Sequence, residues 1–135
     1  MKKYIFFIIV LFFICCTKTP SEPDIYPFDV VVRVVNNSSS PSDTLLYSGT
    51  YGNSNTSIDV DGILALHEYN DYNSFVKDKD DEVFANFRKE QAEGKLTVKI
   101  GTMEVDFMGV EFFQTKKEAS TSAYYGSVYI SWKPV

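Results

Sequence analysis

The segment Phe28–Asn36 reads FDVVVRVVN, and its composition decides the fold class. Successive residues of a strand point to opposite faces. Up to Val35, one face of this segment therefore carries only Phe and Val, and the other carries Val beside Asp29 and Arg33. β-Branched residues also favour an extended backbone, because their side chains are restricted at χ1. We predict a central β-strand that is buried on both sides.

Two further segments have a strand-like composition. Thr44–Tyr51 follows a loop of Asn, Ser and Pro and predicts a second strand. Ala123–Trp132 alternates in the pattern of a long final strand. Gly109, inside the segment Met103–Gln114, indicates a bulge that bends the strand there.

Two hairpins are predicted from their turn residues. In Thr56–Leu66 the pair Asp61-Gly62 suits a type I′ turn, and in Leu96–Phe107 the pair Gly101-Thr102 suits a type II′ turn. The second hairpin alternates apolar and polar residues throughout, so we expect one of its faces in the core. The apolar residues of that face are Leu96, Val98, Ile100, Met103, Val105 and Phe107.

One helix is predicted, over Asp80–Glu93. Asp80 or Asp81 would cap its N-terminus and Gly94 would end it. Val83, Phe84 and Phe87 form an apolar patch at helical spacing, and the charged residues Arg88, Lys89 and Glu90 are expected in solvent.

These elements predict a mainly β fold. Several short strands separated by turn signals favour an antiparallel β-sandwich or a partly open barrel with one short crossing helix. A two-layer α+β arrangement is the alternative. Residues 28–135 have the length of a single domain.

The N-terminus has the pattern of a secretory signal peptide. Lys2 and Lys3 precede the uncharged run Tyr4–Ile14, and small residues follow it. That run has 11 residues, whereas a membrane-spanning helix needs about 20.

The cleavage region, Phe13-Ile14-Cys15-Cys16, resembles the lipobox of bacterial lipoproteins. The resemblance implies that residues 1–15 are removed and that Cys16 is lipidated and becomes the mature N-terminus. Thr17, where the family uses Asp to retain a lipoprotein at the inner membrane, implies delivery to the outer membrane or cell surface. Residues 16–27 are polar and rich in proline, which predicts an extended spacer.

Charge and cysteine content exclude several function classes. The chain has 13 basic and 18 acidic residues and a formal charge of −5; loss of Lys2 and Lys3 leaves 11 basic residues and a charge of −7. This balance disfavours nucleic acid, which is bound by Lys and Arg. With Cys15 removed and Cys16 acylated no thiol remains, so disulfides, thiolate catalysis and Cys-based metal sites are not expected.

The segment Ser57–Glu68 contains a weak calcium-site pattern. Asp59, Asp61 and Glu68 fall on ligand positions of an EF-hand loop around Gly62, but Ser57 replaces the first Asp. The Asp61-Gly62 hairpin explains the same residues, and we favour it; a calcium-stabilised β module is the alternative.

Catalytic patterns are weaker still. His67 is the only histidine, and its sequence neighbour Glu68 would point away from it on a strand. We therefore do not expect an enzyme, and a small cell-envelope hydrolase is the second alternative.

Tyrosine is the more informative residue type. Tyr69, Tyr72, Tyr125 and Tyr129 lie in a loop-like stretch or on the less apolar face of the last strand. Tyrosine offers contact area together with a hydrogen-bonding hydroxyl, so exposed clusters mark binding surfaces. We predict a lipid-anchored, non-catalytic module that binds a protein or a glycan outside the cytoplasm through these four residues, without a cofactor.

Overall fold

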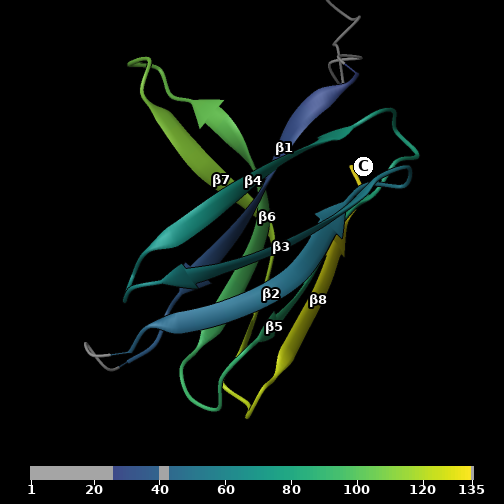
Figure 1. The fold of residues 1–135 in the computed structure, drawn as a ribbon. Helices are drawn as coiled ribbons and strands as arrows, with labels where there is room; N and C mark the ends of the chain where they lie inside the picture. The colour runs from purple at the N-terminus through teal and green to yellow at the C-terminus, as the bar shows by residue number, and fades with distance from the viewer. Residues whose placement is uncertain (1–25, 40–42, 135) are drawn as a thin grey trace, which may run out of the picture.

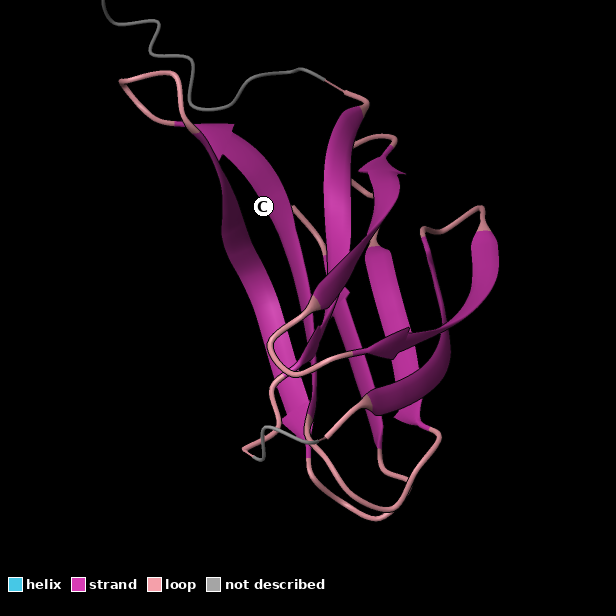
Figure 2. Cartoon of the chain, turned by 60° about the vertical axis from the view of Figure 1, so that its left-hand side comes forward, coloured by secondary structure: helices cyan, strands magenta, loops and turns pink. Residues whose placement is uncertain are grey.

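The structure, a computed structural model, describes residues 26–39 and 43–134. The lipobox, Cys16 and nearly all of the predicted spacer lie outside these residues. The described chain contains eight strands: β1 (Phe28–Asn36), β2 (Leu45–Gly52), β3 (Ser57–Leu64), β4 (Tyr69–Val76), β5 (Val83–Lys89), β6 (Leu96–Val105), β7 (Glu111–Thr121) and β8 (Ser127–Trp132). Figure 2 shows strands and loops only in this part of the chain, which has no helix able to cross a membrane.

The strands form two four-stranded antiparallel sheets that face each other. Sheet A has the order β4-β1-β6-β7, and sheet B has the order β3-β2-β5-β8 (Figure 1). This arrangement confirms the mainly β sandwich. β1 also has the predicted bounds and the predicted central position, because it pairs with β4 on one side and β6 on the other. The expected burial on both faces is only partly met, because Asp29 is exposed and Arg33 and Val35 are half-buried on the outer face.

The predicted helix over Asp80–Glu93 is wrong, and with it the crossing helix and the α+β alternative. Its centre is strand β5, which pairs with β2 and β8. Val83, Ala85, Phe87 and Lys89 are buried at every second position, which is strand periodicity. Lys89, expected in solvent, is fully buried because this alternation directs it inward. Its Nζ donates to the carbonyls of Ala92 and Gly94, at 3.2 and 2.8 Å, and burial lowers its pKa.

The predicted turn at Asp61-Gly62 is also wrong, because both residues lie inside β3. Gly62 is needed there for space: a Cβ would lie 2.5 Å from the Tyr47 hydroxyl. The β2–β3 turn is instead at residues 53–56, where the Asn53 side chain accepts hydrogen bonds from the amides of Asn55 and Thr56, both at 3.0 Å.

Gly101 and Gly109 have exchanged the roles that were predicted for them. Gly101, predicted in the turn, lies within β6 at an irregularity in the β6–β7 pairing, where the Gln114 carbonyl and the Phe113 ring leave no room for a Cβ. Gly109, predicted as a bulge, lies in the β6–β7 turn with a φ of +81°, a conformation that favours glycine. The last strand is shorter than predicted, since Tyr124 and Tyr125 belong to the preceding turn.

The core lies between the sheets and combines Val, Leu and Ile with the aromatic side chains of Tyr47, Tyr51 and Phe87. The Tyr47 and Tyr72 hydroxyls are 2.5 Å apart, and Asn70 Nδ2 donates to the Tyr47 hydroxyl at 2.6 Å. The pKa of Tyr72 is raised, mainly by burial and to a smaller extent by the hydrogen bond with Tyr47. Among the described residues, no buried side-chain nitrogen or oxygen lacks a hydrogen-bond partner.

Asp81 joins the two sheets at one end of the sandwich. Its buried carboxylate accepts hydrogen bonds from the amides of Ser54 in the β2–β3 turn, at 3.0 Å, and of Lys77 and Glu82 in the β4–β5 loop, at 2.8 and 2.9 Å. Burial raises the pKa of Asp81, but these hydrogen bonds outweigh burial and lower it. Both loops are therefore held by one anionic group.

Candidate functional site

The structure does not bring the four predicted tyrosines together. Tyr69 is exposed on the outer face of sheet A, and Tyr72 points between the sheets and stacks on Tyr51. Tyr125 lies in the β7–β8 turn with a φ of +48°. Tyr129 stands on the outer face of sheet B and is 64% exposed. Only Tyr129 lies on an open polar face.

The calcium ligands are also separated. Asp59 and Asp61 lie on the same face of β3, and Asp59 accepts a hydrogen bond from the Thr50 hydroxyl at 2.8 Å. Glu68 lies in the β3–β4 turn, where its carboxylate accepts a hydrogen bond from the Ala65 amide at 3.1 Å. No group of three or more potential metal ligands occurs in the described parts of the chain. An extended strand does not curl these residues around an ion as an EF-hand loop does.

His67 does not form a catalytic arrangement. It lies exposed in the β3–β4 turn with a φ of 66°, and its amide donates to the Asn36 carbonyl at 2.9 Å.

The outer face of sheet B carries two rows of polar side chains that cross all four strands. Strand register places the members of each row directly opposite one another. The first row is Asp59, Thr50, Asn86 and Tyr129; the second is Asp61, Ser48, Arg88 and Ser127. We call these eight residues the polar face.

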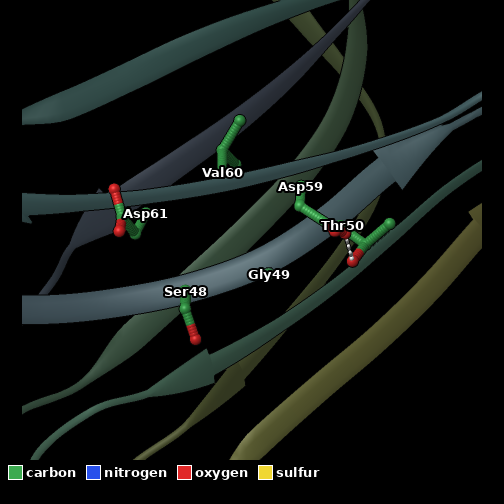
Figure 3. Close-up of a pocket in the computed structure, with 6 residues that line it drawn as sticks. All are labelled: Ser48, Gly49, Thr50, Asp59, Val60 and Asp61. Carbon is green, nitrogen blue, oxygen red and sulfur yellow. Dashed lines mark hydrogen bonds between the residues drawn. The ribbon is translucent and has the colours of Figure 1, made fainter.

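A hollow of about 450 Å³ lies at the β2–β3 side of the polar face. Its lining includes Ser48 and Thr50 from β2 and Asp59 and Asp61 from β3 (Figure 3). The hydrogen bond between Thr50 and Asp59 crosses the two strands at one end of this hollow. The site is thus open and polar and presents two carboxylates and two hydroxyls, of which the hydroxyls already donate hydrogen bonds, Thr50 to Asp59 and Ser48 to Glu90.

Glu90 lies beside the second row and contacts two of its members. Its carboxylate accepts hydrogen bonds from the Ser48 hydroxyl and from the guanidinium of Arg88, the latter at 3.0 Å. These two contacts lower the pKa of Glu90 below its ordinary value, and the hydrogen bond from Ser48 has the larger effect. Arg88 nevertheless keeps 57% of its side chain exposed and can contact a ligand.

The outer face of sheet A is arranged differently. Arg33 pairs with Asp71 through two hydrogen bonds of 2.8 and 2.9 Å. Its guanidinium carbon lies 4.0 Å from the centroid of the Tyr69 ring and 4.2 Å from that of Phe113. The hydrogen bonds with Asp71 raise the pKa of Arg33. We call these four residues the arginine stack, in which the charges of Arg33 and Asp71 are already paired.

The β6–β7 hairpin projects beyond the sandwich (Figure 1). The β1–β6 pairing ends at Val31 and Gly101, whereas the β6–β7 pairing continues to Val105 and Glu111. The predicted core positions beyond Gly101 are exposed, in the part of the hairpin where β6 and β7 continue without pairing to β1. The exposed apolar residues of this projecting hairpin are Met103, Val105, Phe107, Met108, Val110 and Phe112.

Most of the polar face was missed from the sequence. Asp59, Asp61 and Tyr129 were named as site residues, but Asn86 and Arg88 were placed in a helix. The available signal was the inward alternation of Val83, Ala85 and Phe87, which directs Asn86 and Arg88 outward.

Comparison of the chain with protein-family models, with curated proteins and with solved structures finds no match.

Proposed function

We propose that this protein is a lipid-anchored, non-catalytic module that binds a glycan outside the cytoplasm on the polar face of sheet B. The observation that carries the proposal is the row Asp59, Thr50, Asn86 and Tyr129, one outward side chain from each strand. A row that spans the sheet can follow an extended ligand.

The chemistry of the row suits a hydroxyl-rich ligand. Sugar hydroxyls both donate and accept hydrogen bonds, and carboxylate, amide and hydroxyl side chains supply both functions. The exposed ring of Tyr129 offers a flat apolar surface against which the C–H face of a sugar ring can lie. A protein ligand would make less use of this face, because apolar anchors are concentrated elsewhere, on the projecting hairpin.

The anchor part of the proposal rests on the lipobox resemblance. Acyl chains on Cys16 would hold the domain at the cell envelope, at the outer membrane or cell surface, because two or more chains give stable attachment. The calcium alternative has no comparable support, since Glu68 lies apart from Asp59 and Asp61. The hydrolase alternative has none either, since His67 forms no catalytic arrangement.

Glycan arrays and titration calorimetry with the full-length protein test the ligand. Tyr129→Ala is expected to weaken glycan binding about tenfold, the effect of losing an aromatic contact of ~1.4 kcal/mol. Tyr124→Ala is the matched control, because Tyr124 is also exposed but lies in the β7–β8 turn. Equal weakening by the two variants, or no glycan bound by the wild type, contradicts the proposal.

Mass spectrometry of the membrane-extracted protein tests the anchor. The mature N-terminus should be Cys16 with attached acyl chains, and Cys16→Ser should prevent this modification. An unmodified sulfur at Cys16 in the native product removes the anchor from the proposal but leaves the glycan test unaffected.

A further inference from the structure

The projecting hairpin ends in a strongly apolar turn. Phe107 is 98% exposed and Met108 is 75% exposed. Val105 and Val110 flank them and are exposed as well. Contiguous apolar surface of this kind marks a contact with another apolar phase or partner, whereas single exposed apolar residues do not.

The backbone of this turn is internally hydrogen-bonded. The Asp106 carboxylate accepts hydrogen bonds from the amides of Met108 and Val110, at 2.8 and 3.0 Å. The Gly109 amide donates to the Asp106 carbonyl at 3.0 Å, and the Asp106 amide donates to the Val110 carbonyl at 3.0 Å. Backbone groups that enter a bilayer need such partners, because the hydrocarbon supplies none. The turn is thus suited to contact lipid without unfolding.

The position of the turn identifies what it faces. β1 runs antiparallel to β6, with Val31 opposite Gly101, so the start of β1 and the β6–β7 turn lie at the same end of the sandwich (Figure 1). Phe28 follows Cys16 by 12 residues, and a fully extended chain of that length spans at most about 40 Å. An anchor at Cys16 therefore keeps this end of the domain near the membrane.

We propose that the projecting hairpin inserts Phe107 and Met108 into the interface of the same bilayer that holds the acyl chains of Cys16. The inference rests on the proposed anchor. It adds a second contact, which fixes the orientation of the domain relative to the membrane. A lipid chain alone is a flexible tether, whereas two contacts restrict the tilt of the domain relative to the membrane. The polar face then runs parallel to the membrane normal and stays open to a ligand.

The charges near the turn determine the kind of lipid. Glu104, Asp106 and Glu111 surround the apolar tip, and no Lys or Arg lies between Gly101 and Gln114. Attraction to anionic headgroups is therefore absent, and insertion depends on apolar contact alone. The carboxylates also limit the depth of insertion to the interface, because a charged group in the hydrocarbon is costly.

A probe at the tip tests this inference in the acylated full-length protein. Met108→Cys is labelled with an environment-sensitive fluorophore and reconstituted in phosphatidylcholine vesicles that contain a lipid-borne quencher. Ile63→Cys is the matched control: Ile63 is 63% exposed, and its strand ends beside Leu45, at the opposite end of the sandwich. We expect blue-shifted emission and about threefold stronger quenching at position 108 than at 63, and weaker insertion when anionic lipid is added.

Mass spectrometry of the same preparation separates this inference from the anchor. Acylated Cys16 with equal quenching at positions 108 and 63 overturns the inference and leaves the anchor intact. An unmodified Cys16 with a quenched probe at position 108 overturns the anchor and keeps the hairpin as the membrane contact. A probe that is shielded in native membranes but not in pure lipid vesicles shows that a protein partner covers the tip, which also overturns the inference.

Discussion

The outer faces of the two sheets have similar residue types but use them differently. On sheet A, Arg33 is sandwiched between two rings and bonded to Asp71, with 18% of its side chain exposed. On sheet B, Arg88 pairs only with Glu90 and is 57% exposed. Tyr69 contributes to the arginine stack, whereas Tyr129 is not among the ring contacts or cation–π contacts of the described chain.

The register explains this difference. On sheet A, the row Asp71, Arg33, Lys99 and Glu118 places opposite charges next to each other at both edges. On sheet B, the corresponding row separates Asp61 from Arg88 by Ser48. Charged groups that already contact one another stabilise the fold, and groups that remain separated are available to a ligand. The comparison therefore supports the proposal that the outer face of sheet A stabilises the fold and that of sheet B binds a ligand.

Substitution of Asp81 is expected to lower the free energy of unfolding most. Because Asp81 supports both sheets, its loss is a standard against which substitutions on either outer face can be compared. Asp81→Ala leaves three backbone amides without their acceptor and should lower the free energy of unfolding by about 3 kcal/mol. Urea denaturation at pH 7 measures this. If the loss is no larger than that of an exposed substitution on sheet B, the carboxylate does not hold the two loops.

The Asp81 carboxylate should also make the stability of the fold depend on pH in the acid range. Because its pKa is lower in the folded state than the ordinary value of 3.8, the unfolded state binds the proton first as pH falls. Its stabilisation is present above that value and is lost as pH falls through the folded pKa. Asp81→Asn should flatten this part of the stability profile.

The next largest loss of stability is expected from an aromatic residue, and it should differ between the two faces. Phe113→Ala should destabilise the fold by about 2 kcal/mol, because its ring covers Gly101 and the Arg33 guanidinium. Tyr129→Ala should change stability by less than about 0.5 kcal/mol. Thermal and urea denaturation of the two variants compare them, and similar losses would remove the distinction between the faces.

The two arginines provide a smaller and more specific comparison. Arg33→Ala should lower the free energy of unfolding by about 1–2 kcal/mol, since it removes an ion pair and two cation–π contacts. Arg88→Ala should stay within about 0.5 kcal/mol, as expected for an exposed pair. A larger loss for Arg88 would reverse the assignment of the faces.

The smallest expected effect is that of calcium on sheet B. Millimolar calcium should shift the melting temperature by less than about 1 °C, because Asp59 and Asp61 lie on an extended strand away from Glu68. A site that binds calcium weakly adds little to the stability of the folded state. Thermal melts with calcium and with chelator measure it. A clear upward shift that Asp59→Asn abolishes would mean that the polar face holds an ion.

Local pattern predicted the parts of the fold that depend on periodicity alone. Phe28–Asn36 could be placed with its correct bounds, because a run of β-branched residues favours an extended backbone and its apolar content favours a central rather than an edge strand. The candidate site was predicted only in part. Asp59, Asp61 and Tyr129 were found as single residues, but the row that connects them depends on β5, whose charged flanks had suggested a helix.

The sequence by itself determined that the chain forms a β-rich domain around a Val-rich central strand, because side-chain branching and period-two burial act within a few residues. Only the tertiary structure decided which glycines turn the chain and which faces are covered. Gly62 is required by the side chain of Tyr47, and Gly101 by the Gln114 carbonyl and the Phe113 ring, all of which belong to other strands. Phe107 is exposed because the β1–β6 pairing ends before β6 does. These outcomes depend on contacts between distant segments, which no local pattern specifies.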